Sequence, residues 1–193
     1  GVCLGAQLAA DVLGGPVTRN RQQEIGWFDV SLTAAGQQSS LFREFPDRFL
    51  AFHWHGDTFA IPPGAIRLAS SEACENQAFQ YQDRVVGLQF HWDYSLAGVQ
   101  RMVQHCGHEL VAGPTIQHAR ELLAAPERLE RTQELLDQLL DAIAIAGQII
   151  VGQELGATRP DAAFAASVRM IGLSVAVGAG FALVFLGLGD VIP

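Results

Sequence analysis

The sequence contains no lysine, and its twelve basic residues are all arginine. Twenty acidic residues outnumber them, and the formal net charge is −8 at pH 7. Affinity for nucleic acids comes mainly from cationic side chains that neutralise phosphates, so this composition argues against a nucleic-acid partner. Charged residues make up only 17% of the chain and apolar residues 49%, which excludes a disordered chain and predicts a sizeable core.

Cysteine is also scarce, with Cys3, Cys74 and Cys106 as its three positions. An odd and sparse set does not form a disulfide framework and fits a reducing compartment, so we expect a cytoplasmic protein. The 193 residues give room for one domain of ordinary size with an appendage. The chain begins at Gly1 without a Met, in the middle of the motif described below, so we expect it to be an N-terminally truncated fragment.

Hydrophobic periodicity predicts an α/β fold. A helix is expected from Leu4 to Leu13, with apolar positions at Leu4, Leu8 and Val12, closed by the turn residues 14–16. Short apolar or alternating runs predict strands, which cover Ile25–Leu32, Phe49–Phe52, Ile66–Ala69, Gln77–Tyr81 and Val85–Phe90. After residue 91 the period becomes helical, and a longer helix is expected from about Pro126 to Ala146, with Gly147 as its cap.

The opening Gly1-Val2-Cys3-Leu4-Gly5 has the form Gly-x-Cys-x-Gly, which is the thiol version of a nucleophile elbow. We expect the two glycines to keep side chains out of a sharp strand-to-helix turn, so that the sulfur stands exposed. At a helix N-terminus the thiolate is favoured, and the N–H of Leu4 could serve an oxyanion. The alternative is a buried structural cysteine beside a tight turn, and the pentapeptide alone does not decide between them.

A nucleophilic cysteine needs a base, and His91 directly follows the expected strand Val85–Phe90. This position puts the imidazole at the edge of an open sheet where an elbow presents its cysteine. Asp93, two residues further on, could hold the imidazole in its productive tautomer. A lone histidine is more often a structural residue, but the strand position and the acidic neighbour favour a base.

Three segments together resemble the class I glutamine amidotransferases. They are Gly-Val-Cys-Leu-Gly-Ala-Gln at 1–7, His-Gly-Asp at 55–57 and Val-Gly-Leu-Gln-Phe-His at 86–91. The order and spacing are closest to the stand-alone type related to the glutaminase domain of GMP synthase, and the resemblance extends over residues 1–146. It implies part of a flavodoxin-like open sheet with flanking helices, to which a C-terminal apolar helix is added.

The resemblance also implies the chemistry. Cys3 is expected to attack the side-chain amide of L-glutamine, with His91 as base and then as acid toward the leaving ammonia, and Asp93 as third member. Gln7 is expected to help hold the substrate, and main-chain groups around Trp54, His55 and Gly56 to hold its amino-acid end. Neither a metal nor an organic cofactor is required, and the expected partner is a synthase or acceptor-substrate domain.

The sequence departs from the family pattern in two ways. The family has His-Pro-Glu or a close variant, whereas this chain reads His91-Trp92-Asp93, and the aspartate is one methylene shorter. We therefore expect its carboxylate to miss the imidazole unless the backbone adjusts. The family also places strands and an oxyanion-hole segment ahead of its nucleophile, and the 193 residues do not include them.

Other cysteines and histidines are weaker candidates. His53 and His55 alternate on an expected strand and could together chelate a metal, and Cys106 lies between His105 and His108. Neither spacing is diagnostic, so hydrogen-bonded or solvated histidines are expected and no metal site is predicted.

The C-terminal region differs from the rest of the chain in charge and hydrophobicity. Residues 147–167 are expected to form a linker and 168–190 an apolar helix, because residues 170–189 are uncharged over twenty positions. This length just crosses a bilayer, so membrane anchoring through 170–189 is one alternative. A helix buried in a partner interface and a tail foreign to the family are the others.

Three functions are compatible with these residues. The leading hypothesis is a glutamine amidotransferase that releases ammonia for an acceptor. The second is a catalytically inactive relative that acts as a binding or regulatory module, suggested by Asp93 and by the segments that the family has ahead of its nucleophile. The third is a cysteine hydrolase or peptidase on a similar frame, which leaves Gln7 and the His55–Asp57 segment without a role.

Overall fold

The structure is a computed structural model that describes the chain except residues 83, 125, 158–159, 170–171 and 173–193. The chain divides into two compact units, Gly1–Leu140 and Asp141–Pro193. The boundary lies within the long helix α5 (Pro126–Gly156). All expected site residues lie in the first unit.

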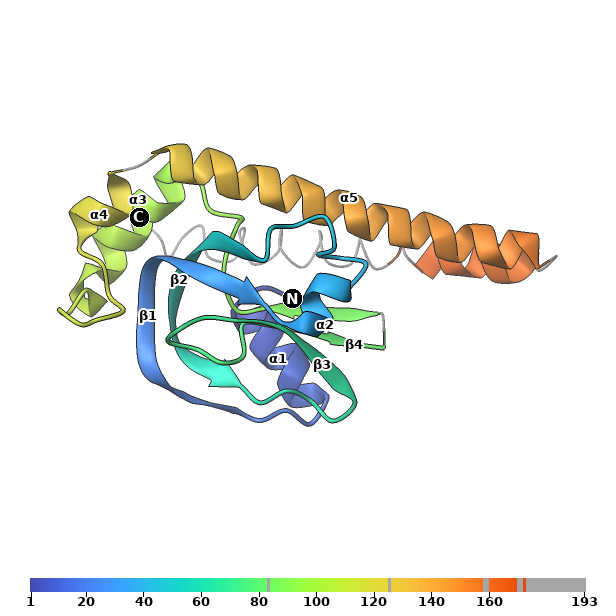
Figure 1. The fold of residues 1–193 in the computed structure, drawn as a ribbon, viewed down its shortest axis with the longest axis horizontal. Helices are drawn as coiled ribbons and strands as arrows, with labels where there is room; N and C mark the ends of the chain where they lie inside the picture. Colours follow the sequence, from blue (N-terminus) through green and yellow to red (C-terminus); the bar gives the residue numbers. More distant parts are fainter. Residues whose placement is uncertain (83, 125, 158–159, 170–171, 173–193) are drawn as a thin grey trace. The chain divides into compact units, whose positions relative to one another are not determined.

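Within the described residues, five strands form one curled open sheet in the order β2-β1-β3-β4-β5 (Figure 1). Their bounds are β1 Val17–Leu32, β2 Arg48–Phe59, β3 Ala65–Ser70, β4 Ala78–Tyr81 and β5 Val85–Leu88. β1 and β2 pair along most of their length, and the register shifts between Arg19 and Glu24. A shift of this kind bends a strand and increases its twist, in keeping with the curved paths of β1 and β2.

The expected α/β class and open sheet are confirmed, but a flavodoxin-like parallel arrangement is wrong for these strands. Every neighbouring pair in the sheet is antiparallel. Parallel neighbours need a crossover of a dozen or more residues, whereas the neighbours β3 and β4 are joined by residues 71–77 and the neighbours β4 and β5 by residues 82–84. Parallel pairing is found in isolated bridges, one of which joins Val2 to Leu88.

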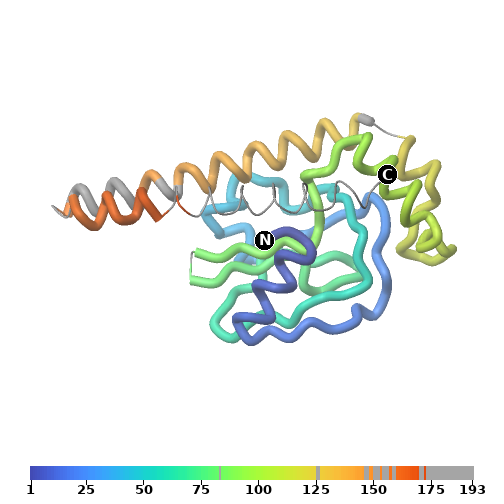
Figure 2. Tube along the Cα trace, turned by 180° about the vertical axis from the view of Figure 1, so that it is seen from behind, coloured from blue at the N-terminus to red at the C-terminus, as the bar shows by residue number. Residues whose placement is uncertain are grey.

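Helices cover the sheet. Their bounds are α1 Leu4–Val12, α2 Ala34–Gln38, α3 Leu96–Cys106 and α4 Ala119–Leu123, with a 3-10 turn η1 at Gly107–Glu109. α1 contacts β5 and parts of β1 and β2, and both views place it beside the last strands (Figure 2). α3 and α4 contact each other, and α4 contacts β1. The start of α1 is thereby fixed next to β5, which leads to His91.

Both faces of the sheet carry buried side chains. Successive residues of a strand point to opposite faces, so β2 contributes to a different core on each side. In β2, Phe49 and Ala51 belong to a core that includes Phe42, Phe90 and Trp92. Phe52 and Trp54 belong to a second core with Ile25, Trp27 and Val99 of β1 and α3. A strand that is buried on both faces usually carries an almost continuous run of apolar residues. In β2 this run is interrupted by the buried side chains of His53 and His55.

The expected helix after Cys3 is confirmed, but the face it buries differs from the one marked by its large apolar residues. Leu4, Leu8 and Val12 are 64%, 59% and 86% exposed, whereas Ala6 and Ala10 are fully buried. The alanines pack in a cluster with Phe59 and Phe79. Small side chains let the helix approach the sheet closely, so side-chain size rather than hydrophobicity decides which face is inside.

The long helix does not end at Gly147, because α5 continues to Gly156. One glycine in a helix interior costs only about 1 kcal/mol relative to alanine, which neighbouring helix-forming residues offset. The expected linker 147–167 is therefore helical in its first ten residues, and residues 160–169 are helical as well. Most of the expected apolar helix 168–190 lies outside the described residues. Among the helices that are described, none combines the length and the apolar character needed to cross a bilayer.

Candidate active site

Cys3 lies at a sharp junction between a parallel bridge and a helix. Val2 forms the bridge with Leu88, the Cys3 N–H donates to the Leu88 carbonyl at 2.7 Å, and α1 begins at Leu4. The Cys3 backbone has φ 47° and ψ −111°, a conformation that residues with a β-carbon rarely adopt. Such strain, about 1–3 kcal/mol, is found mostly where function requires a particular side-chain direction.

The two glycines of the motif have different roles. A β-carbon at Gly1 would collide with the backbone carbonyl of Gly5. A β-carbon at Gly5 would meet no described atom within 4 Å. The expectation that both glycines relieve crowding therefore holds for Gly1 and is wrong for Gly5.

Leu4 is the first residue of α1, so its N–H is one of the groups that a helix leaves without a partner of its own. The next N–H groups are occupied locally, since Gly5 donates to the Val2 carbonyl and Ala6 and Gln7 donate to the Cys3 carbonyl. A free N–H at a helix N-terminus can stabilise negative charge that develops next to the sulfur.

His91 is held beside this junction by backbone pairing with β2. Its N–H donates to the Phe52 carbonyl at 2.8 Å, and its carbonyl accepts from the Phe52 N–H at 3.1 Å. The imidazole Nδ1 lies 2.9 Å from Asp93 Oδ1. The chain bends at Trp92, directly after the bridge between His91 and Phe52, and with this backbone the shorter aspartate reaches the imidazole.

The imidazole is charged at neutral pH. Burial lowers the pKa of His91, but hydrogen bonds and electrostatic interactions with Asp93 and Cys3 outweigh burial and raise the pKa to about 9. Burial raises the pKa of Asp93, yet the hydrogen bond from His91 dominates and brings it below its ordinary value. Tyr94 packs edge-on against the His91 ring, with ring centroids 4.8 Å apart, and burial raises the pKa of its hydroxyl to about 12.

Gln7 lies one helical turn beyond Cys3 and is buried. Its amide Nε2 donates to the Asp57 carbonyl at 3.3 Å and to Gln89 Oε1 at 3.1 Å. The amide N–H groups thus already have acceptors within the protein. This arrangement connects the helix after Cys3 with the Gly56–Asp57 segment of β2.

Trp54, His55 and Gly56 lie near the end of β2. The Trp54 indole N–H donates to Glu109 Oε2 at 3.2 Å, and the Trp54 ring packs against Phe52. His55 is buried, with Nδ1 3.0 Å from the Asp57 carbonyl and Nε2 3.1 Å from Glu24 Oε2. The His55 side chain therefore fixes the backbone that Gln7 also contacts.

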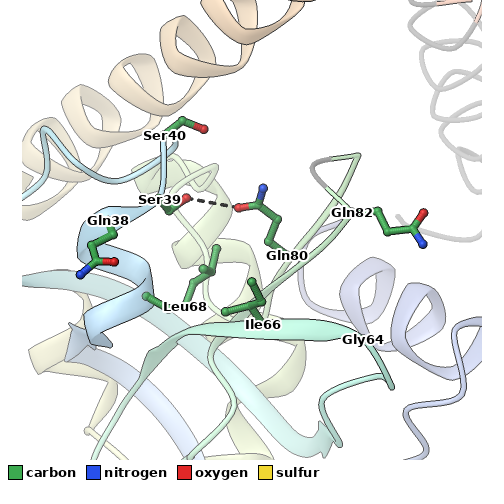
Figure 3. A pocket seen from close by; sticks show the side chains of 9 residues that line it. Gln38, Ser39, Ser40, Gly64, Ile66, Leu68, Gln80 and Gln82 are labelled. Atoms are coloured by element: carbon green, nitrogen blue, oxygen red, sulfur yellow. Dashed lines mark hydrogen bonds between the residues drawn. The ribbon is translucent and has the colours of Figure 1, made fainter.

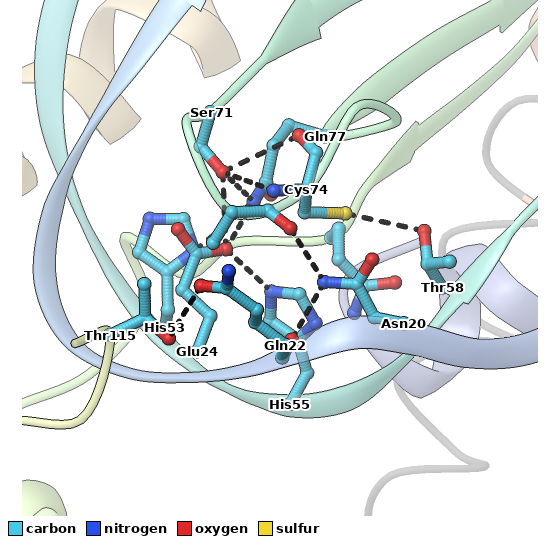
Figure 4. A network of polar contacts seen from close by, with 12 residues as sticks. Asn20, Gln22, Glu24, His53, His55, Thr58, Ser71, Cys74, Gln77 and Thr115 are labelled. Atoms are coloured by element: carbon cyan, nitrogen blue, oxygen red, sulfur yellow. Dashed lines mark hydrogen bonds and ion pairs between the residues drawn. The ribbon is translucent and has the colours of Figure 1, made fainter. Parts of the chain in front are cut away.

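Glu24, His53 and His55 form a buried cluster at the centre of the β1–β2 pairing (Figure 4). Glu24 Oε2 is reached by Gln77 Nε2 at 2.7 Å, by Ser71 Oγ at 3.2 Å and by ring nitrogens of both histidines. Burial raises the pKa of Glu24, but the two histidines outweigh it and place the pKa well below its ordinary value. Burial lowers the pKa of His53.

The cluster is the one group of three ligand side chains close enough for a metal ion within the described part of the chain, its ligand atoms lying within 4.8 Å of one another. The carboxylate oxygen that a cation would need is already surrounded by hydrogen-bond donors. Both histidines are hydrogen-bonded, His55 through both ring nitrogens and His53 through Nδ1, and His53 Nε2 has no hydrogen-bond partner among the described residues. Sequence reasoning missed Glu24, whose partner could be identified only from the register that places it opposite His55.

The remaining cysteines lie elsewhere. Cys74 is buried with its sulfur 3.2 Å from Thr58 Oγ1, and burial raises the pKa of its thiol. Cys106 ends α3, and among the residues that the structure describes it does not join His105 and His108 in a metal-binding group.

A depression of about 500 Å³ lies between α2, β3 and β4 (Figure 3). Ser39 donates to Gln80 Oε1 across it at 3.2 Å, and Leu68 and Ile66 form its floor. The described residues that line it include none of the expected site residues. Its lining is uncharged and mixes polar with apolar side chains, and it shares no residue with the Cys3 region.

Comparisons with known proteins agree with the motifs. The family model for glutamine amidotransferase class-I matches residues 1–106. A glutamine amidotransferase-like protein of Salmonella typhimurium is 31% identical over 147 residues, which cover 76% of this chain and 62% of the relative. A glutamine-hydrolyzing GMP synthase subunit of Sulfolobus acidocaldarius is 37% identical over 93 residues, covering 47% of this chain and 48% of that relative.

A solved structure shows the same fold. The crystal structure of a glutamine amidotransferase from Thermotoga maritima matches with a TM-score of 0.64 and 39% identity, covering 74% of this chain and 60% of that one. The chain spans less than two thirds of the length of each of these relatives. The family model covers more than half of the chain and includes Cys3 and His91, so this chain belongs to the class I glutamine amidotransferase family.

Proposed function

We propose that this chain hydrolyses the side-chain amide of L-glutamine and supplies the ammonia to an acceptor. The observation that carries the proposal is the strained Cys3 at the N-terminus of α1, next to an imidazole that Asp93 orients. Family membership makes glutamine the expected substrate. The relative named as a glutamine-hydrolyzing GMP synthase subunit supports a partner that carries the acceptor chemistry, either as a domain or as a separate chain.

The proposed reaction begins with His91 protonated, as its raised pKa indicates. The Cys3 thiolate forms a bond to the amide carbon, and the carbonyl electron pair moves onto oxygen, where the Leu4 N–H stabilises it. Collapse of this intermediate breaks the C–N bond, and the His91 proton goes to the leaving nitrogen, which departs as ammonia.

Hydrolysis completes the cycle. His91, now neutral, removes a proton from water as the water oxygen attacks the thioester carbon. The C–S bond breaks, glutamate leaves, and the thiolate and protonated imidazole are restored. Asp93 remains ionised throughout and keeps His91 Nδ1 protonated, so that the other ring nitrogen faces the reaction.

The test is ammonia release from glutamine by the purified protein and by Cys3→Ala. We expect turnover in the first and a loss of about 10³-fold or more in the second, because the covalent step is removed. Asp93→Asn should lower the rate by about tenfold or more while the protein remains folded. Equal turnover by the protein and its Cys3→Ala form would overturn the proposal.

The second candidate is an inactive binding or regulatory module. The presence of Asp93 where the family has glutamate favours it, although the carboxylate reaches His91. This candidate predicts glutamine binding by calorimetry without ammonia release. Turnover that depends on Cys3 would exclude it.

A further inference from the structure

Gln89 is a wholly buried amide that contacts the sulfur of Cys3. It directly follows β5 and is 0% exposed, and its Nε2 lies 3.6 Å from Cys3 Sγ. Its backbone N–H donates to the Gln77 carbonyl at 2.8 Å, which holds this position beside the chain that precedes β4. Residues 89 and 90 form a bend between β5 and the bridge at His91, and both Gln89 and His91 interact with Cys3.

The orientation of the Gln89 amide is determined by a backbone carbonyl. The Asp57 carbonyl can only accept, so the nitrogen of the Gln7 amide must face it. The same nitrogen lies 3.1 Å from the Gln89 amide, which must therefore present its oxygen to Gln7. The Gln89 nitrogen is left pointing at the sulfur.

A donor fixed in this way discriminates between two forms of the sulfur. A thiolate accepts a hydrogen bond well, because the acceptor is charged, whereas a thiol is a weak acceptor. The amide is fully buried, so water does not replace the donor easily, and a buried amide without a partner is unfavourable.

Resting on the proposed role of Cys3 as nucleophile, we propose that Gln89 is a further catalytic residue, whose amide N–H holds the Cys3 thiolate and keeps it aligned beside His91. Through Gln7 the same chain of hydrogen bonds ties the sulfur to the Gly56–Asp57 segment, expected to bind the amino-acid end of glutamine. The position of the nucleophile and the shape of this segment are thereby coupled.

The test measures the rate of Cys3 alkylation by iodoacetamide against pH, assigned by peptide mass spectrometry. Gln89→Leu removes the donor, and Gln89→Glu keeps the size and the acceptor for Gln7 while replacing the donor by an oxygen. We expect both to move the midpoint of the profile upward by about one pH unit, and to lower Cys3 alkylation at pH 7 about tenfold. Cys106, remote in sequence and partly exposed, is the internal reference and should react at an unchanged rate.

Protection of the buried Cys74 from alkylation reports that each variant is folded. A folded variant whose Cys3 midpoint stays within about 0.3 pH units of the wild type would overturn the proposal. A second measurement needs no Gln89 variant: the side-chain amide NMR signals of Gln89 should titrate with the midpoint of Cys3 alkylation, and Cys3→Ala should abolish that titration. Signals that do not titrate would also overturn it.

Neither readout involves glutamine. A protein that shows the predicted Cys3 profile but releases no ammonia would contradict the proposed function and with it a catalytic role of Gln89, whereas the assignment of Gln89 as hydrogen-bond donor to the Cys3 sulfur would stand. Ammonia release together with an unchanged alkylation profile in the Gln89 variants would support the proposed function and contradict the role assigned to Gln89.

Discussion

Cys3, the proposed nucleophile, has an unfavourable backbone conformation. Its positive φ is imposed from two sides, by the pairing of Gly1–Cys3 with Leu88 and by the start of α1. The strain stays because relieving it would break one of these contacts. The strain accompanies the placement of a half-buried sulfur at the N-terminus of α1.

The strain predicts an unusual order of stability among variants. Glycine adopts φ near +47° readily, whereas alanine keeps the β-carbon that makes this region unfavourable. We expect Cys3→Gly to have a free energy of unfolding about 1 kcal/mol higher than Cys3→Ala, although glycine usually destabilises. Urea denaturation of the two variants measures this difference. A Cys3→Ala protein more stable than Cys3→Gly would show that the residue is not strained.

The two motif glycines give a second prediction. Gly1→Ala should lower the free energy of unfolding by about 1–3 kcal/mol, because its β-carbon collides with the Gly5 carbonyl. Gly5→Ala should raise it by about 0.5–1 kcal/mol, since the position is open and lies in a helix. Each variant is the control for the other in thermal or urea denaturation. Similar losses from both would contradict the assigned asymmetry.

Two cross-strand carboxylate contacts in the pairing of β1 with β2 lie in very different environments. Glu24 meets His55 in the core, at a point where the strands are directly opposite. Asp29 meets Arg48 at 2.7 Å on the same pair of strands, with both side chains largely exposed. Burial should make the first much more important than the second, because water screens exposed pairs.

Glu24→Gln should therefore lower the free energy of unfolding by about 2 kcal/mol at pH 7, and Asp29→Asn by less than about 1 kcal/mol. The pKa of Glu24 is lowered in the fold, so its contribution is present above the ordinary value of 4.5 and is lost as pH falls below it. Glu24→Gln should lose less stability than the wild type between about pH 5 and pH 3. Equal acid sensitivity of the two proteins would be evidence against the network.

The sequence separation of two contacting residues decides which contacts could be predicted from the sequence. The turn around Cys3 and the contact of His91 with Asp93 each lie within a short segment, so each could be predicted from its local sequence, and the resemblance to the family brought the two segments together. Glu24 and Gln89 depend on partners 31 and 86 residues away, His55 and Cys3. No local pattern encodes those distances. The buried face of α1 could not be predicted either, since its alanines carry a weaker hydrophobic signal than its exposed leucines.

At the level of the molecule, the protonation of His91 affects both the stability of the fold and the proposed chemistry. The pKa of His91 is raised from 6.5 to about 9, so its stabilising effect is full below pH 6.5 and is lost as pH rises through about 9. We expect the free energy of unfolding to fall by about 1–3 kcal/mol between about pH 6.5 and pH 9.5. The titratable groups that face the His91 ring are Cys3, Asp93 and Tyr94. Asp93→Asn removes the carboxylate among them and is therefore the variant to compare with the wild type.

In Asp93→Asn the loss of stability over this pH range should be smaller, because the main partner of the imidazolium is gone. Urea denaturation at several pH values gives both curves. Parallel curves for the two proteins would mean that the pair does not stabilise the fold.

The most direct measurement of the central claim is covalent labelling by a chloroketone analogue of glutamine. Peptide mass spectrometry should find the label on Cys3, glutamine should slow the reaction, and simple amides without the amino-acid end should not. Cys74 and Cys106 serve as unlabelled references in the same digest. Labelling of Cys106 at the same rate as Cys3, or a Cys3 reaction that glutamine leaves unchanged, would contradict a glutamine site built around Cys3 and His91.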